Sequence, residues 1–196
     1  MTGEQVRQLY RDAVRATAGT GLFPEVMITQ LILESGPSLS SLARRANNFF
    51  GIKSGAAWTG KVISMSTSEY SGSTRYTVPG TGKIYANRRA ALADGAQAAS
   101  LFRYYDTATE GLRGWVQFLQ QNPRYTRAGV FAARNPVEQF AALARAGYAT
   151  DPRYVQKLVS VYTRYKEFFF SSGAAGATGG TFLIIAALIV LFRYLR

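Results

Sequence analysis

Residues 25–34 constrain the fold of this chain more than any other segment. Pro24 stands where proline favours the first turn of a helix, and Gly36 stands where glycine commonly ends one. The segment would be apolar on nearly every side of a helix, through Val26, Met27, Ile28, Leu31, Ile32 and Leu33. Such a helix is stable only when other elements surround it. We therefore predict a buried central helix around which the rest of the domain packs.

Glu34 ends this helix, so its carboxyl group emerges among apolar neighbours. Two effects are expected to raise the pKa of that carboxyl. Desolvation by the apolar surroundings is the larger effect, and the carbonyl-rich carboxy-terminal end of the helix is the smaller. A carboxyl that keeps its proton near neutral pH can act as the general acid of glycoside cleavage. On spacing alone, a solvated glutamate at a helix end is the commoner outcome.

The composition narrows the class of protein. With 196 residues, 47% of them hydrophobic and 17% charged, the chain can form one packed domain and an appendage. A formal net charge of +12 implies an anionic partner, but the basic residues are scattered, so we expect no nucleic-acid partner. The sequence contains no histidine or cysteine, which excludes disulfides, thiolate chemistry and histidine-ligated metals. We expect neither a metal nor a cofactor.

The carboxy-terminal segment differs from the rest of the chain. No charged residue stands between Glu167 and Arg193, and residues 182–192 are continuously apolar. A helix over 174–192 would be about 28 Å long, close to the hydrocarbon thickness of a bilayer. We therefore predict a Gly/Ala/Ser joint over 171–180 and a single transmembrane helix over 174–193, which would place the protein in a membrane. A buried core helix is the alternative. The polar, amphipathic start of the chain predicts no amino-terminal signal peptide.

Helical patterns flank a middle segment rich in glycine, serine, threonine and valine. Helical periodicity and capping residues mark segments at 2–18, 41–46, from 107, 135–147 and from 151. Alternation predicts strands at 61–70, 75–78 and 83–85, the last two as a hairpin. Residues 88–103 are ambiguous and receive no assignment. The pattern predicts one α+β domain over residues 1–170, with a β lobe at about 55–87.

Two strings, Ala46-Asn-Asn-Phe-Phe-Gly-Ile-Lys53 and Gly147-Tyr-Ala-Thr-Asp-Pro152, are long enough to be specific. They accompany Glu34-Ser-Gly36 and Thr67-Ser-Glu-Tyr70. Together these motifs resemble the glucosaminidase family of bacterial cell-wall hydrolases, glycoside hydrolase family 73 of the flagellar-rod muramidase type. The resemblance spans about residues 20–165. It implies a lysozyme-like fold, mostly helical with a small β lobe.

The resemblance also implies an activity, which is hydrolysis of the β-1,4 bond on the reducing side of N-acetylglucosamine in peptidoglycan. The general acid of the family falls on Glu34. The acidic residue that the family places in its β lobe falls on Glu69, where it could activate water; a solvated strand glutamate is the alternative. One departure stands beside the acid, because Pro37-Ser38 replaces the usual Trp-Gly of the family.

Further positions match residues that would bind substrate. Tyr148 resembles a tyrosine that lines the scissile bond and would orient the sugar, with a core tyrosine as the alternative. Asn47 and Asn48 would fix the loop after the catalytic helix and could offer an amide to the N-acetyl group. Trp58 could stack on a sugar ring, and Tyr70 would contact substrate beside Glu69.

The sequence is compatible with three functions. The first is a membrane-anchored endo-β-N-acetylglucosaminidase whose partners are peptidoglycan strands and, through the carboxy-terminal helix, a lipid membrane. A phage or virion origin would explain how such an enzyme without an export signal reaches the wall. The second is a lytic transglycosylase on the same substrate, which needs no second carboxylate. The third is a non-catalytic membrane or virion structural protein that keeps the fold.

Overall fold

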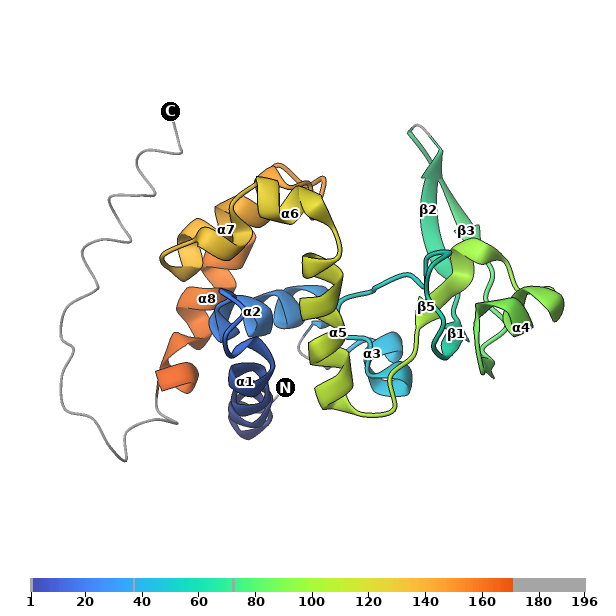
Figure 1. The fold of residues 1–196 in the computed structure, drawn as a ribbon, viewed down its shortest axis with the longest axis horizontal. Coiled ribbons are helices and arrows are strands. Elements are labelled where there is room, and N and C mark those ends of the chain that lie inside the picture. Colours follow the sequence, from blue (N-terminus) through green and yellow to red (C-terminus); the bar gives the residue numbers. More distant parts are fainter. Residues whose placement is uncertain (1, 37, 72, 171–196) are drawn as a thin grey trace.

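The structure is a computed structural model that describes residues 2–36, 38–71 and 73–170. Figure 1 shows two lobes side by side, one made of helices and one that contains the described strands. The helical lobe contains α1 (Gly3–Thr17), α2 (Pro24–Ser35), α5 (Ala108–Gln120), α6 (Pro123–Arg127), η2 (Val130–Ala132), α7 (Pro136–Arg145) and α8 (Tyr154–Phe170). The β lobe contains β1 (Val62–Ser64), β2 (Thr67–Ser71), β3 (Thr74–Val78), β4 (Ile84–Tyr85), α4 (Arg88–Ala93), η1 (Ala98–Ser100) and β5 (Leu101–Arg103). Helix α3 (Ser41–Ala46) lies where the lobes meet.

Helix α2 is the buried centre of the helical lobe, as its sequence predicts. Val26, Met27, Ile28 and Leu31 have no exposed surface, and α2 packs against α1, α7 and α8. Pro24 occupies the first turn, and the N–H of Gly36 donates to the Ile32 carbonyl at 3.0 Å to close the last turn. Apolar residues on all sides of α2 are thus covered by neighbouring helices, which leaves only its carboxyl end at an edge of the lobe.

Capping side chains fix the ends of the surrounding helices. Thr2 and Thr107 form capping boxes with Gln5 and Glu110 at the start of α1 and α5. The Asn135 side chain accepts from the backbone N–H of Glu138 at 2.9 Å at the start of α7. These signals are local in the sequence, and the predicted helix starts agree with them.

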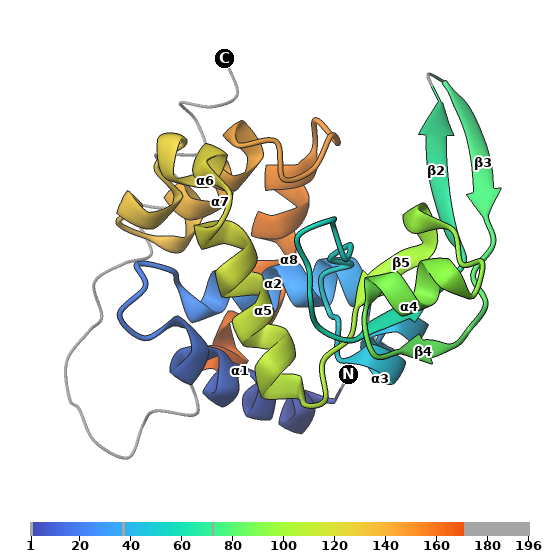
Figure 2. The same ribbon diagram turned by 45° about the vertical axis from the view of Figure 1, so that its right-hand side comes forward.

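The strands form two small antiparallel sheets. One has the order β4-β1-β5, with Ile63 opposite Ile84 and Phe102. The other is the β2-β3 hairpin, with Glu69 opposite Tyr76. Figure 2 shows this hairpin standing out from the rest of the β lobe.

The strand prediction is therefore wrong in its pairing. The predicted strand 61–70 is interrupted at residues 65–66, and β3 pairs with β2 rather than with β4. Gly80 crosses the interruption so closely that a Cβ there would fall 2.2 Å from the Met65 backbone. This crossing lets β4 return to β1, and the previously unassigned segment supplies α4 and β5.

The predicted membrane helix over 174–193 and its joint over 171–180 lie outside the described residues. Among residues 2–36, 38–71 and 73–170, no helix combines the length and apolar character needed to cross a membrane. Helix α8 has 17 residues, includes charged Lys157, Arg164, Lys166 and Glu167, and packs against α2 and α7. The predicted carboxy-terminal transmembrane helix, and the membrane location drawn from it, are wrong for this structure. The expected phage or virion association, which depended on that helix, loses its basis.

Candidate active site

Glu34 lies in the last turn of α2, at the edge of the helical lobe, with part of its surface open to solvent. Protein atoms around the carboxyl desolvate it, and this burial raises its pKa above the ordinary value of 4.5. A hydrogen bond from the Tyr154 hydroxyl acts in the opposite direction and is the smaller effect. The carboxyl is therefore accessible to a ligand, and it holds its proton more tightly than a free glutamate does. Both properties are required of a general acid.

Tyr154 and Tyr148 form an aromatic wall beside Glu34. Their rings stack with centroids 6.0 Å apart and planes 12° from parallel. Burial raises the pKa of the Tyr148 hydroxyl well above its ordinary value, and the nearby Tyr154 and Glu34 raise it further. Tyr148 therefore stays neutral, and it lies close enough to Glu34 for the two groups to interact electrostatically. The structure places Tyr148 beside Glu34, and its expected role in orienting a sugar stays a prediction.

Tyr154 was missing from the sequence-derived site. It begins α8, and its buried hydroxyl accepts a hydrogen bond from the Gln30 Nε2 at 2.6 Å, one turn before Glu34 on α2. No local pattern in the sequence reveals that this tyrosine reaches across to α2. A buried polar Gln30 four residues before the acid was the available signal, because a buried amide needs a partner.

Glu69 belongs to the other lobe, on β2 of the projecting hairpin. Its Oε1 accepts from the Lys53 Nζ at 2.8 Å, and 32% of its side chain is exposed. The Lys53 ammonium also lies 4.1 Å above the centre of the Phe102 ring. We expected Glu69 to share one continuous strand with Ile63, but Ile63 is buried in β1 and belongs to a different sheet. The two candidate carboxylates thus stand on different lobes.

The side chains of Asn48 and Asn47 form hydrogen bonds with the protein backbone. Asn48 is 1% exposed; its Nδ2 donates to the carbonyls of Ile52 and Arg103, and its Oδ1 accepts from the Ile52 N–H, each at 2.9 Å. Asn47 adopts a left-handed conformation with φ of 49° at the end of α3, and its Nδ2 donates to the Tyr105 carbonyl at 2.9 Å. These bonds tie the loop after α3 to β5, so the side-chain amide of Asn48 is already occupied.

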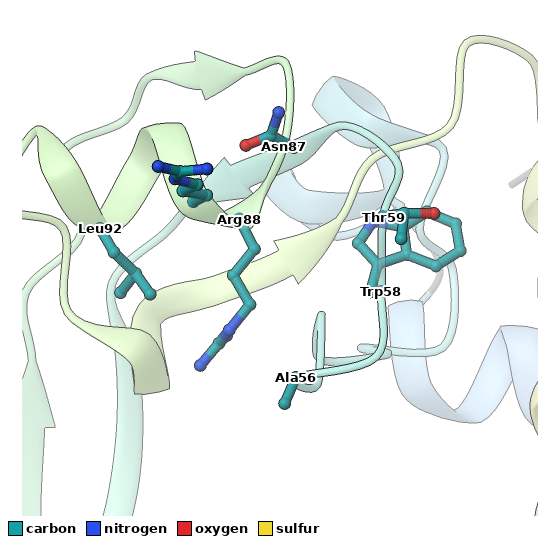
Figure 3. Close-up of a pocket in the computed structure, with 7 residues that line it drawn as sticks. Ala56, Trp58, Thr59, Asn87, Arg88 and Leu92 are labelled. Atoms are coloured by element: carbon teal, nitrogen blue, oxygen red, sulfur yellow. The ribbon is translucent and has the colours of Figure 1, made fainter.

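Trp58 lines a hollow of about 420 Å³ in the β lobe, between its own loop and α4 (Figure 3). Glu34 is not among the residues that line this hollow. Tyr70 pairs with Arg75 through the β2-β3 backbone, and the structure describes no more of it than that. Within the described ranges, no group of three or more acidic residues is placed to hold a metal ion.

The carboxyl end of α2 is fixed to the loop that carries the Asn-Asn motif. The Ser35 hydroxyl donates to the Phe49 carbonyl at 2.9 Å, and the Phe50 ring stacks on Trp115 of α5 at 5.5 Å. A Cβ at Gly111 of α5 would fall 1.9 Å from the Asn47 carbonyl oxygen. The sequence motif 46–53 therefore positions the end of α2 against both the β lobe and α5.

Comparison with known proteins finds relatives that match most of this chain. Residues 10–167 match the family model Glucosaminidase, described as mannosyl-glycoprotein endo-beta-N-acetylglucosaminidase. Peptidoglycan hydrolase FlgJ of Pseudomonas aeruginosa is 30% identical over 84% of this chain and 36% of its own length. Exo-glucosaminidase LytG of Bacillus subtilis is 29% identical over 74% of this chain and 44% of its own length. The chain thus spans less than half the length of these relatives.

Solved structures give the same result. A peptidoglycan hydrolase from Sphingomonas sp. A1 superposes with a TM-score of 0.65 at 25% identity, covering 91% of this chain and 99% of that one. The glycoside hydrolase domain of Salmonella typhimurium FlgJ superposes with a TM-score of 0.59 at 27% identity, covering 85% and 90%. Because the family model matches most of the chain and the fold agrees, this chain belongs to the glucosaminidase family of glycoside hydrolases.

Proposed function

We propose that this chain hydrolyses the β-1,4 glycan backbone of peptidoglycan as an endo-acting β-N-acetylglucosaminidase, with Glu34 as the general acid. The observation that carries the proposal is the placement of Glu34, whose desolvated carboxyl ends the central helix and remains accessible from solvent. The similarity to peptidoglycan hydrolases supports the choice of substrate. The net charge of +12 suits an anionic wall.

In the proposed reaction the protonated Glu34 gives its proton to the glycosidic oxygen as the bond from that oxygen to the anomeric carbon breaks. A water molecule adds to the anomeric carbon and loses a proton, so that two shorter glycans result. The neutral hydroxyls of Tyr154 and Tyr148 orient the acid and the sugar beside it. The long-range bond from Gln30 keeps Tyr154 in place for that task.

Glu69 is proposed as the group that accepts the proton of the attacking water. Its Oε1 is engaged by Lys53, which leaves Oε2 for the water. Because Glu69 stands on the β2-β3 hairpin and Glu34 on α2, the substrate would bind between the two lobes. The proposed roles of Trp58 and Tyr70 are to contact sugar or peptide groups on the same β-lobe side.

The test is mass spectrometry of the fragments released from purified peptidoglycan sacculi. The wild-type protein should release fragments with a reducing N-acetylglucosamine, and Glu34→Gln should release at least about 100-fold less. Glu4→Gln is the matched control, since it removes an exposed carboxylate on α1. Products with a 1,6-anhydro end would show that the protein is a lytic transglycosylase and not a hydrolase. If the wild type releases no fragments, the protein is non-catalytic and the proposal is wrong.

A further inference from the structure

The hollow beside Trp58 combines apolar walls with positive charge. Trp58, Ala56 and Leu92 supply apolar surface, and Arg88 and Arg89 supply two guanidinium groups. Figure 3 shows Arg88 extending between Leu92 on α4 and the loop that carries Ala56 and Trp58. A volume of about 420 Å³ is enough for several amino-acid residues of a ligand.

The positive charge in this hollow has no carboxylate partner in the described part of the chain. The three lysines between residues 50 and 90 each pair with an acidic residue, in the pairs Lys53–Glu69, Lys61–Asp106 and Lys83–Asp94. Arg88 instead donates to the neutral Ser54 hydroxyl at 3.1 Å, and Arg89 is exposed. None of the residues that line the hollow is acidic. Two neighbouring cations without a counter-charge favour an anionic ligand.

The apolar wall of the hollow is held rigidly. The Trp58 Nε1 donates to the Lys61 carbonyl at 2.9 Å, and the Arg103 guanidinium lies 4.5 Å from the centre of the indole ring. Tyr105 contacts the same ring edge-on at 5.9 Å. A ring fixed by three neighbours loses little conformational entropy when a ligand packs on its remaining surface. Trp58 is partly buried against the apolar cluster of the β lobe and also lines the hollow.

A short series of contacts connects the hollow to the end of the catalytic helix. The Arg103 that packs on Trp58 accepts from Asn48 through its carbonyl. Asn48 adjoins Phe49, whose carbonyl accepts from Ser35, the residue next to Glu34. The hollow and the end of α2 are therefore linked through two adjacent residues of one loop, Asn48 and Phe49.

We propose that this hollow binds the acidic peptide stem of peptidoglycan while the glycan lies at Glu34, an inference that rests on the proposed function. Stem peptides carry both alanine methyl groups and free carboxylates, which match the apolar and cationic groups present here. Arg88 and Arg89 bind the carboxylates, and Trp58 and Leu92 contact the alanine methyl groups. Asn87 uses its Oδ1 to cap α4 through the Ala90 N–H, which leaves its Nδ2 to donate to a peptide carbonyl.

The test compares two substrates, intact glycan strands that carry peptide stems and strands from which an amidase has removed them. For Arg89→Gln and for the pair Arg88→Gln with Arg89→Gln, the ratio of kcat/KM on stem-bearing to stem-free strands should fall about tenfold. Arg113→Gln is the matched control, because it removes one exposed guanidinium from α5 in the other lobe. An unchanged ratio in the double variant overturns the proposal.

Direct binding separates this proposal from the proposed function. A synthetic stem peptide titrated into the full chain should change the fluorescence of Trp58, and Arg89→Gln should weaken that binding about tenfold. If the wild type cleaves neither substrate but binds the peptide in this way, the enzyme proposal fails and the stem site stands. If the wild type cleaves both substrates equally well and does not bind the peptide, the stem site is wrong and the enzyme proposal stands.

Discussion

The Nε2 of Gln30 donates to the hydroxyl of Tyr154 at 2.6 Å, and this bond joins residues 124 positions apart in the sequence. Because the hydroxyl oxygen accepts from Gln30, its own hydrogen is free to point toward Glu34. That hydrogen bond lowers the pKa of Glu34, while the larger effect of burial raises it. Two opposing contributions thus determine the pKa of Glu34, and the hydrogen bond from Tyr154 can be removed by a single substitution.

Replacing Tyr154 with Phe should move the pH dependence of activity. The change removes the hydrogen bond that lowers the pKa of Glu34, so the pKa rises further. Since Glu34 must be protonated to act, the basic limb of the kcat/KM profile should shift to higher pH. Tyr165→Phe, which removes a hydroxyl from the same helix, is the control. A Tyr154→Phe profile that coincides with the wild type would show that the hydroxyl does not act on Glu34.

Replacing Glu34 with Gln should increase stability above the pKa of the acid. A carboxyl whose pKa is raised in the folded state binds protons more tightly there, so the wild type loses stability as pH rises from 4.5 through the folded pKa. The amide carries no such cost. Urea unfolding at about pH 7 should therefore give a higher free energy of unfolding for Glu34→Gln than for wild type, with the gap closing below the ordinary pKa. A gap that is constant with pH would exclude this linkage.

Asn48→Ala should destabilise the fold rather than only weaken substrate binding. It removes three hydrogen bonds, including the one that the buried Ile52 N–H donates to Asn48, although the Ile52 carbonyl keeps the Arg103 N–H as a partner. The expected loss is roughly 3 kcal/mol of unfolding free energy. Asn47→Ala removes one side-chain bond and should cost less. Thermal and urea unfolding of the two variants measure the difference. Equal losses of unfolding free energy would show that the three hydrogen bonds of Asn48 do not stabilise the fold more than the one of Asn47.

Glu69→Gln should lower kcat by about 100-fold with little change in KM, if Glu69 accepts the proton of water. Its ion pair with Lys53 is partly exposed, so the variant should lose less than about 1 kcal/mol of stability. Lys53→Ala removes the other half of the pair and controls for that loss. Full activity in Glu69→Gln would show that Glu69 does not activate the water and would favour assistance by the acetamido group of the substrate.

The sequence predicts the parts of this fold that local chemistry decides. Pro24 and Gly36 set the limits of α2, and Thr2 and Thr107 cap their helices as expected. The raised pKa of Glu34 also follows from its position at the end of an apolar helix. These features depend on residues within one or two turns of each other.

The sequence fails where distant segments decide the outcome. Alternation over 61–70 gives no sign that the strand breaks at Met65 or that β3 turns back to β2. Asn47 and Asn48 were expected to fix their loop and to offer an amide to the substrate, but the motif does not reveal that a partner of Asn48 is the Arg103 carbonyl, 55 residues away. Tyr154 was missed for the same reason, since its partner Gln30 lies on another helix.

The close approach of Gly111 to the Asn47 carbonyl limits which residues position 111 can accept. Helix and loop meet there main chain to main chain, and even a methyl group would collide at 1.9 Å. Backbone atoms that no rotamer can adjust therefore fix how closely α5 approaches the end of α3. Any side chain at position 111 would have to push the Asn47 backbone aside, and with it the loop whose Phe49 carbonyl accepts from Ser35 beside Glu34.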